Sequence, residues 1–198
     1  RSIGNYAFRN SALSYFTMPY ENLISLGTNI FAGTSVSRLM IDDGWNFDML
    51  DMLGVPFENI TIDVVLGSTK YALDTNGYVY DVVNGVKRIL RVNADVTTNG
   101  GTLTIDGDVI IGDYAFAEDK NVRTLKVTNG EIVGVGKGAF YNSALQNVVG
   151  RWAIDAIPAY AFYGSALINF ELSNEITEIG DYAFANNEGV KEFFPGVT

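Results

Sequence analysis

Apolar residues recur along this chain in blocks that repeat every 22 to 24 residues, with one longer interval. The hexapeptide IGDYAF occurs at 111–116 and again at 179–184, and residues 3–8 read IGNYAF. With weaker copies included, the final residues form a series at intervals of 23, 85, 24, 22 and 22: Phe8, Phe31, Phe116, Phe140, Phe162 and Phe184. A catalytic motif is needed once, whereas a stacked structural unit is needed many times. The pattern therefore predicts an array of repeats with one large interruption.

Each repeat has two dissimilar halves. After the Phe comes a segment with the spacing apolar-x-x-apolar-x-apolar, such as ALSYFTM at 12–18 and VRTLKV at 122–127, which is typical of a short strand. The half that ends in IGxxAF has Gly four residues before the Phe and Ala directly before it, which predicts a tight turn with the Phe filling the interior. Because a unit this short cannot bury its apolar face alone, stacked copies should share one core and place their strands in parallel at about 4.8 Å.

The 85-residue interval contains a disguised copy of the same template. Around Phe57, apolar residues occupy the positions five and eight residues before and after: Met52, Met49, Ile62 and Val65. We interpret Phe57 as the interior residue of a seventh repeat. This interpretation predicts that Ile62 and Val65 lie on a strand hydrogen-bonded beside the strand at 35–41. The chain should then leave the solenoid near Gly67.

Residues 67–108 do not follow the repeat pattern. Asn-Gly occurs at 76–77, 84–85 and 99–100, each time between runs of β-prone residues. Asn-Gly is a strong hairpin signal because both residues tolerate a positive φ. We therefore predict an antiparallel β-meander of three or four strands, inserted into a single solenoid domain that covers residues 1–198.

The copies IGDYAF…VRTLKV and EITEIGDYAFANNEGVKEFFP resemble the BspA-type leucine-rich repeat, whose pattern couples an IGxxAF corner to a following LxxLxL strand. The resemblance covers about four-fifths of the chain, although the family's usual Cys after the corner is absent. It implies an α/β leucine-rich-repeat solenoid, right-handed and horseshoe-like, with short helical or 3-10 corners and a parallel sheet on its concave face. It also implies a bacterial cell-surface or secreted protein that binds other molecules, often host matrix proteins or partner cells.

Composition narrows the possible functions. The net charge of −10 argues against nucleic-acid binding, which requires basic patches. No apolar run reaches 18 residues, so we predict no membrane span in this chain. No signal peptide is visible, and the chain opens within a repeat at Arg1, from which we expect a mature or trimmed form.

With neither His nor Cys in the chain, the usual catalytic triads, cysteine nucleophiles and zinc sites cannot be built. We predict no enzymatic activity, no metal and no cofactor. A glycosidase needs two carboxylates facing each other across a cleft, and we interpret the available group as solvated loop acids: Asp42, Asp43, Asp48 and Asp51. Asp74 begins a segment similar to a calcium loop, but the twelfth position is Gly85 and not an acid, which favours a turn.

The residues that the template directs outward from the strands are candidates for ligand binding. Exposed aromatic and Arg side chains on a concave surface fit a protein-binding patch, although ordinary surface residues would have the same pattern. Arg123 and Lys126 stand out because cations are scarce in this acidic chain. The candidate set on the concave face is Tyr15, Arg38, Met40, Arg123, Lys126, Gln146, Asn147, Asn169 and Glu171.

We predict a non-enzymatic extracellular or cell-surface module that binds a protein ligand, such as a host extracellular protein, through the concave sheet, the meander or both. The alternative is a carbohydrate-binding surface protein that stacks sugars on the aromatic residues Trp45, Tyr71, Tyr78 and Tyr80. A hydrolase is a third and weaker hypothesis. The sequence indicates neither the identity of the ligand nor the oligomeric state.

Overall fold

The computed structural model describes residues 2–18, 25–43, 45, 47, 52–56, 59–168, 170, 176–187 and 189–190. The chain forms two compact units, and each is described here by itself. The first comprises Arg1–Leu73 with Asn93–Asp95, and the second comprises Asp74–Val92 with Val96–Thr198. A single solenoid domain over residues 1–198 therefore stays a prediction.

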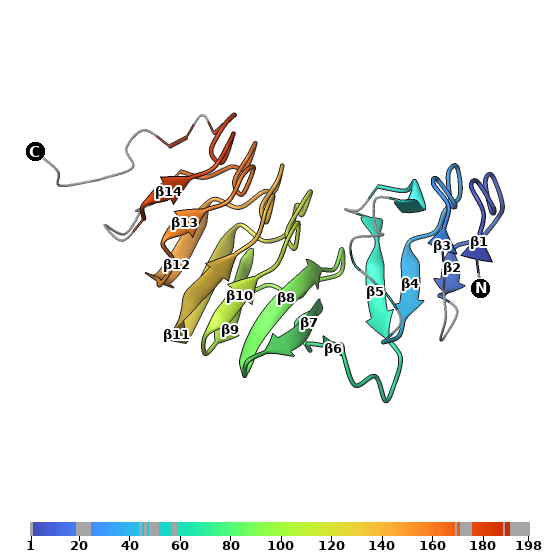
Figure 1. Ribbon diagram of the computed structural model, residues 1–198, viewed down its shortest axis with the longest axis horizontal. Helices are drawn as coiled ribbons and strands as arrows, with labels where there is room; N and C mark the ends of the chain where they lie inside the picture. Colours follow the sequence, from blue (N-terminus) through green and yellow to red (C-terminus); the bar gives the residue numbers. More distant parts are fainter. Residues whose placement is uncertain are drawn as a thin grey trace, which may run out of the picture. The chain divides into compact units, whose positions relative to one another are not determined.

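The first unit is built from short parallel strands in two stacks (Figure 1). The strands of these stacks are β1 (Ser2–Ile3), β2 (Tyr15–Thr17), β3 (Ser25–Leu26), β4 (Arg38–Ile41) and β5 (Thr61–Val64), and the short strand β6 (Ala72–Leu73) belongs to neither stack. β1 pairs in parallel with β3, while β2, β4 and β5 form a three-stranded parallel sheet. Each of the first two coils thus contributes one strand before its corner and one after it.

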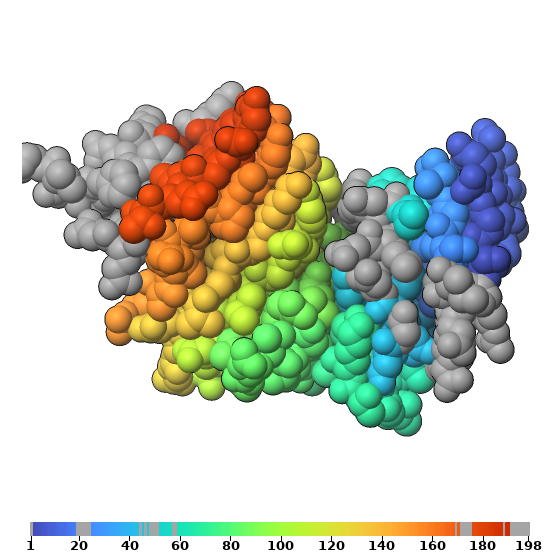
Figure 2. Space-filling model, in the orientation of Figure 1, coloured from blue at the N-terminus to red at the C-terminus, as the bar shows by residue number. Residues whose placement is uncertain are grey.

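The second unit repeats this plan over more coils. Its strands are β7 (Tyr78–Val83), β8 (Val86–Val92), β9 (Thr102–Asp106), β10 (Val109–Ile111), β11 (Thr124–Val135), β12 (Asn147–Trp152), β13 (Ala156–Ile157) and β14 (Glu178–Ile179). The ladder β8–β10–β11–β12 is parallel, β9 pairs in parallel with β11, and β13 pairs in parallel with β14. Consecutive coils appear as adjacent bands from green to red in Figure 2.

The observed architecture corrects two parts of the expected fold class. The residues that the structure describes contain strands and turns but no α-helix, so the α/β assignment and the helical corners are wrong. Positions with 3-10 geometry among them are isolated, at 47, 52–53 and 59. The structure likewise lends no support to a horseshoe shape. The segment before each corner, which we expected to be only a turn, instead forms a second stack of strands.

The corners require left-handed backbone at two positions. The residues two before and two after each Phe have φ between 49° and 71° in all six coils: Tyr6, Asn10, Asn29, Gly33, Tyr114, Glu118, Gly138, Asn142, Tyr160, Gly164, Tyr182 and Asn186. At the Phe between these two positions, the backbone amide donates to the carbonyl of the residue before the Phe of the next coil, as in Phe140 N–H to Ala161 O at 2.7 Å. These turns hold the Phe inward while hydrogen-bonding one coil to the next.

The Gly four residues before the Phe is needed because successive coils approach closely there. A Cβ at Gly136 would lie 2.6 Å from the carbonyl carbon of Gly112 in the preceding coil. At Gly180 a Cβ would lie 2.5 Å from the amide nitrogen of Ala159. Real Cβ atoms essentially never come this close, so a larger residue at Gly136 or Gly180 would force the backbone to shift, although the coil of Phe162 has Pro158 at this position. Gly4 differs, because a Cβ there would have no atom within 4 Å.

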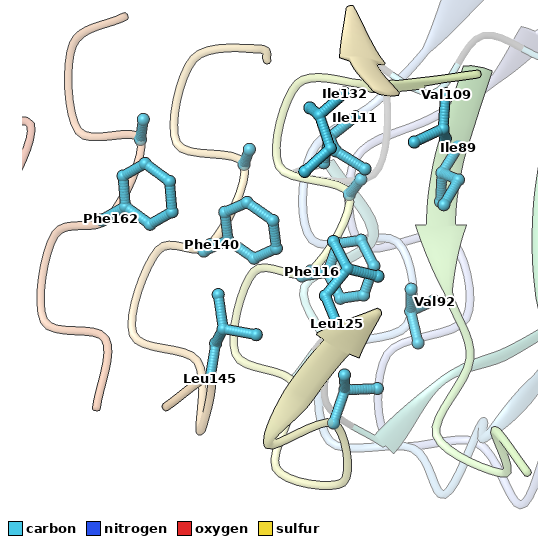
Figure 3. Close-up of a cluster of buried hydrophobic side chains, with 14 of the residues drawn as sticks. Ile89, Val92, Val109, Ile111, Phe116, Leu125, Ile132, Phe140, Leu145 and Phe162 are labelled. Atoms are coloured by element: carbon cyan, nitrogen blue, oxygen red, sulfur yellow. The ribbon is translucent and has the colours of Figure 1, made fainter. Parts of the chain in front are cut away.

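The repeat phenylalanines form a column through the core (Figure 3). The rings of Phe116 and Phe140 lie 4.9 Å apart, and those of Phe140 and Phe162 lie 5.1 Å apart with an interplanar angle of 11°. Phe184 continues the column at 5.1 Å from Phe162. Phe140 and Phe162 are fully buried, which confirms the register inferred from the repeat.

The strand that we expected beside residues 35–41 is confirmed, but the register assigned from Phe57 is wrong. Leu39 pairs with Ile62, not with Val65, whose amide donates to Ile41 O at 2.9 Å. Phe31 N–H donates to Leu53 O, and the Leu53 side chain is fully buried. The Leu53 carbonyl therefore corresponds to the carbonyl that precedes the Phe in the other coils, while Phe57 itself lies outside the described residues.

Part of the predicted meander is present in the region 67–108, where β7 and β8 form an antiparallel hairpin. β7 and β8 pair antiparallel across Asn84 and Gly85, both with positive φ, as Asn-Gly predicts. The rest of the region joins the parallel ladders, because β8 pairs with β10 and β9 pairs with β11. Val92 is buried, and its amide donates to Ala115 O at 2.9 Å, as the Phe amides do in other coils. This coil escaped sequence detection because Val92 replaces the Phe.

Asn93 closes the outer edge of β5. Its Oδ1 accepts from Ile62 N at 2.9 Å, and its Nδ2 donates to Ile62 O at 2.9 Å. The Asn93 side chain is buried. One side-chain amide thus satisfies both backbone groups of Ile62, which a further strand would otherwise pair.

We expect Phe140→Ala and Phe162→Ala each to lower the free energy of unfolding by about 3–5 kcal/mol, because each leaves a cavity in the Phe column. The double mutant should lose less than the sum, since the two rings are in contact. Urea denaturation of the wild type, both single mutants and the double mutant measures this coupling. Strict additivity would contradict a shared column.

We expect Gly136→Ala to lower the free energy of unfolding by about 1–3 kcal/mol, because the new methyl group overlaps the backbone of the preceding coil. Gly4→Ala is the matched control, since it occupies the same template position with open space around it. Thermal and urea unfolding of both variants test the prediction. Equal destabilisation would show that close approach is not the reason for the glycine.

Candidate functional site

The first unit brings three of the sequence-predicted residues together. β2 and β4 pair so that Tyr15 lies opposite Arg38 and Thr17 lies opposite Met40. The Tyr15 hydroxyl donates to Met40 Sδ at 3.5 Å and accepts from Thr17 Oγ1 at 3.1 Å. Tyr15 and Arg38 are exposed, whereas the intervening Leu39 is buried, as alternation along a strand requires. These side chains form one small outward-facing cluster.

Arg38 has a counter-ion that the sequence did not indicate. Its Nε donates to Asp63 Oδ2 at 2.5 Å and its Nη2 donates to Asp63 Oδ1 at 2.9 Å, a bidentate pair across β4 and β5. Asp95 lies 4.0 Å from Nη1. The hydrogen bond and charge of Asp63 raise the pKa of Arg38 further above its ordinary value. Arg38 is therefore a charged but compensated group.

The second unit brings together four further candidates at the start of β11 and β12. Arg123 directly precedes β11, and its carbonyl accepts from Gln146 N at 2.7 Å and from Asn147 N at 3.0 Å. Lys126 lies within β11 and pairs in register with Val149 of β12. Leu125 between the two cations is buried, so Lys126 projects from the opposite side of the sheet.

Arg123 and Lys126 differ from Arg38 in their electrostatic environment. Both are exposed, and no ion pair within the described part of the chain includes either of them. The aliphatic part of the Arg123 side chain lies against Gly101. The two cations thus form a local positive feature on an acidic protein.

A shallow pocket lies beside these residues at β12. Its volume is about 400 Å³, and its lining includes Thr124, Asn147, Val149, Gly150, Trp152 and Phe170. The mixture of small polar groups with two aromatic rings is typical of a recognition surface. Sequence analysis missed Trp152, although a Trp within a strand segment is a signal for such a surface. Asn169 and Glu171, which we also predicted, lie outside the described residues.

The aromatic platform of the carbohydrate hypothesis does not exist as expected. Trp45, Tyr71 and Tyr78 are buried, with 2%, 6% and 2% of their surface exposed. The Tyr71 hydroxyl donates to Trp45 O at 2.7 Å, which ties both rings into the interior. Tyr80 is half-buried beneath the Lys87 ammonium, 4.6 Å from the ring centroid. None of these four rings presents a free face for stacking a sugar.

The candidate carboxylates have structural partners. Asp43 accepts hydrogen bonds from the Ser68 hydroxyl, from Thr69 N and Oγ1, and from Lys70 N. These donors hold the pKa of Asp43 well below its ordinary value. Asp74 Oδ1 accepts from Asn76 N at 2.9 Å, which is the turn that the sequence favoured. Asp48 and Asp51 lie outside the described residues.

Neither metal-binding clusters nor membrane-spanning helices occur in the parts of the chain that the structure describes. Among those residues, no three or more metal-ligating side chains gather at one place. In the same residues, no helix has the length and apolar character needed to cross a bilayer.

Stacked coils of 22 to 24 residues with parallel strands and an interior Phe column define a leucine-rich-repeat type of solenoid. The family model for the BspA type leucine rich repeat region matches residues 1–48 and 102–195 in six copies. This match covers more than half of the chain, and the chain belongs to that family. The unmatched stretch contains Phe57 and the hairpin.

Two solved structures share the fold. One is a leucine rich cell surface protein from Faecalibacterium prausnitzii A2-165, with 22% identity and a TM-score of 0.55, covering 96% of this chain and 44% of that one. The other is the pneumococcal vaccine antigen PcpA, with 17% identity and a TM-score of 0.55, covering 96% of this chain and 41% of that one. This chain thus spans less than half the length of either structure. No curated protein matches it in sequence.

We expect Asp43→Asn to lower the melting temperature at neutral pH, because the neutral amide accepts the four hydrogen bonds less strongly. The pKa of Asp43 is depressed in the folded state, so its stabilising contribution is present above the ordinary carboxyl pKa and is lost as the pH falls toward the depressed value. The difference in melting temperature between wild type and variant should therefore shrink below about pH 4. Ser68→Ala, which removes one donor, should show the same trend with a smaller amplitude. A pH-independent difference would exclude this explanation.

Proposed function

We propose that this chain is a non-enzymatic binding module of a bacterial cell-surface or secreted protein, and that it recognises an acidic region of a protein ligand through β11 and β12. The contact surface comprises Arg123, Lys126, Gln146 and Asn147 together with the pocket beside them. The observation that carries the proposal is the pair of exposed cations without ion-pair partners among the described residues.

The geometry supports recognition rather than catalysis. The strands hold these side chains on rigid, hydrogen-bonded backbone, so little conformational entropy is lost when a ligand binds. Arg123 offers a planar group for bidentate contacts to a carboxylate, and Lys126 adds a second exposed charge three residues further along the chain. Asn147 and Thr124 add neutral hydrogen-bonding groups at the pocket.

Electrostatics makes this surface selective. The chain carries a net charge of −10, so its overall field repels an acidic partner. A local cation pair permits such a partner to bind in one place and one orientation only. Arg38, which we predicted to contribute, is already neutralised by Asp63 and is assigned a supporting structural role instead.

The family and the structural neighbours support an extracellular setting. The F. prausnitzii protein is described as a cell surface protein, and PcpA is described as a vaccine antigen. We extend the surface location to this chain, with adhesion to a host matrix protein or a partner cell as its role.

The test reverses the two charges. Arg123→Glu with Lys126→Glu should weaken binding at least tenfold, because each lost charge-assisted contact contributes about 1.5–3 kcal/mol. Wild type and double mutant are passed over an immobilised panel of extracellular matrix proteins, and surface plasmon resonance is recorded at low and moderate salt. The melting temperature should stay nearly unchanged, because exposed charges contribute little stability.

A second double mutant controls for net charge. Lys120→Glu with Lys137→Glu also reverses two charges, but at the corners rather than on the face of β11. It should leave binding within about twofold of wild type at moderate salt, where long-range fields are screened. If the Arg123 and Lys126 double mutant bound as tightly as wild type, with the same salt dependence, the binding site would not lie on β11 and β12.

A further inference from the structure

The corners present tyrosines where the backbone favours other residues. Tyr6, Tyr114, Tyr160 and Tyr182 stand two residues before the Phe with φ between 54° and 59°. Left-handed backbone is unfavourable for a bulky residue, and the same position holds Asn29 or Gly138 in the other two coils. The Tyr side chain must therefore bring an advantage that the backbone does not supply.

In two of these coils the residue directly after the Phe covers the tyrosine ring. The Arg9 guanidinium lies over the Tyr6 ring, 5.4 Å from its centroid. The Tyr163 ring lies 5.8 Å from that of Tyr160. In the coils of Tyr114 and Tyr182 the covering position holds an alanine, Ala117 or Ala185. A methyl group covers far less of the ring than Arg or Tyr does.

Charge varies together with this covering residue. Where a cation or ring covers the tyrosine, the residue before it is neutral: Asn5 or Ala159. Where the residue after the Phe is alanine, the residue before the tyrosine is an acid: Asp113, whose Oδ1 accepts from Lys137 N at 2.8 Å in the next coil, or Asp181. The contrast is between IGNYAFR at 3–9 and IGDYAFA at 111–117 and 179–185. The first heptapeptide contains its own cation, whereas the second combines an aromatic ring and a carboxylate without one.

The two identical heptapeptides have different surroundings. Ala117 is buried, and its carbonyl accepts from Arg91 Nη1 at 3.0 Å, so the chain already supplies a guanidinium beside this corner. Ala185 is only half-buried, and 62% of the Tyr182 surface is exposed. Within the described residues, no cation lies over the Tyr182 ring. The Tyr160 ring stacks behind Tyr182 at 5.3 Å and holds it in place.

We infer that Asp181, Tyr182 and Ala185 form a receptor for a cationic side chain, an arginine or lysine, of a protein partner. The cation lies over the exposed part of the Tyr182 ring, as Arg9 lies over Tyr6, and the Asp181 carboxylate compensates its charge. The acidic protein as a whole attracts such a partner. This surface is distinct from the cation pair on β11 and selects the opposite charge, so the two assignments stand independently.

N-acetyl-arginine amide is the probe, and the neutral isostere N-acetyl-citrulline amide is its control. The protein is labelled with ¹³C in its tyrosine rings, and ring signals are followed by NMR during titration. Wild type should show saturable shifts of the Tyr182 and Tyr160 signals, with a dissociation constant on the order of 10 mM. Citrulline should bind at least tenfold more weakly. Equal responses to both compounds would overturn the inference.

Substitutions that the fold already contains locate the site. Tyr182→Asn places at this corner the residue type that Asn29 supplies at the same position with φ of 53°, and it should abolish the saturable shifts. Asp181→Asn with Ala185→Arg, which recreates the heptapeptide of the first coil, should abolish them as well. Tyr114→Asn is the matched control and should retain the response. If the Tyr182 variant or the Asp181 and Ala185 double variant kept the saturable shifts, the assignment would be overturned. Loss of these shifts in Tyr114→Asn would overturn it as well.

A gain-of-function variant completes the test. Asn5→Asp with Arg9→Ala converts the first coil to IGDYAFA and should add saturable shifts at Tyr6, with affinity similar to that at Tyr182. If this variant showed only the shifts of the wild type and none at Tyr6, the claim that Arg9 marks the position of the bound cation would be contradicted. Thermal melts of all variants verify that each is folded.

Discussion

The close approach of one coil's backbone to the next at the corners governs how the coils of this solenoid stack. Gly136 and Gly180 contact the preceding coil where a Cβ would overlap backbone atoms. At this separation the corner amide of one coil reaches a carbonyl of the next, as Phe116 N–H reaches Ala139 O at 2.8 Å. The same separation sets the spacing of the rings in the Phe column at about 5 Å. At these two coils the glycine therefore permits both the hydrogen-bond ladder and the packing of the core, whereas the coil of Phe162 has Pro158 at the same position.

Much of this fold was predictable because the repeat carries its own register. The Phe period indicated the column, and Asn84-Gly85 indicated the β7–β8 hairpin. The second strand stack was not predictable, because strands of two or three residues such as β1 and β10 are too short for an alternating pattern. The coil before β5 was detected but placed three residues off, and the coil around Val92 escaped detection because Val replaces the Phe while the hydrogen bond from its amide preserves the geometry.

The sequence indicated which candidate side chains are exposed, but not which residues they contact. Alternation along the strands correctly directed Tyr15, Arg38 and Lys126 outward. That Asp63 neutralises Arg38 depends on the register of β5, which was assigned three residues off. The burial of Tyr71 and Tyr78 depends on tertiary contacts of the segment around β6 and β7, which no local pattern contains. A repeat template indicates which way a side chain points, whereas its partners come from neighbouring coils.

The Asn93 side chain determines where the sheet of β2, β4 and β5 ends. Exposed edges of parallel sheets readily accept strands from other molecules, which is a common route to aggregation. By occupying both the amide and the carbonyl of Ile62, Asn93 leaves no complementary pair of groups at the centre of the β5 edge. Because the amide is shorter than a strand and cannot itself be extended, it terminates the ladder. The first unit thus ends its three-stranded sheet with the side-chain amide of a single buried residue.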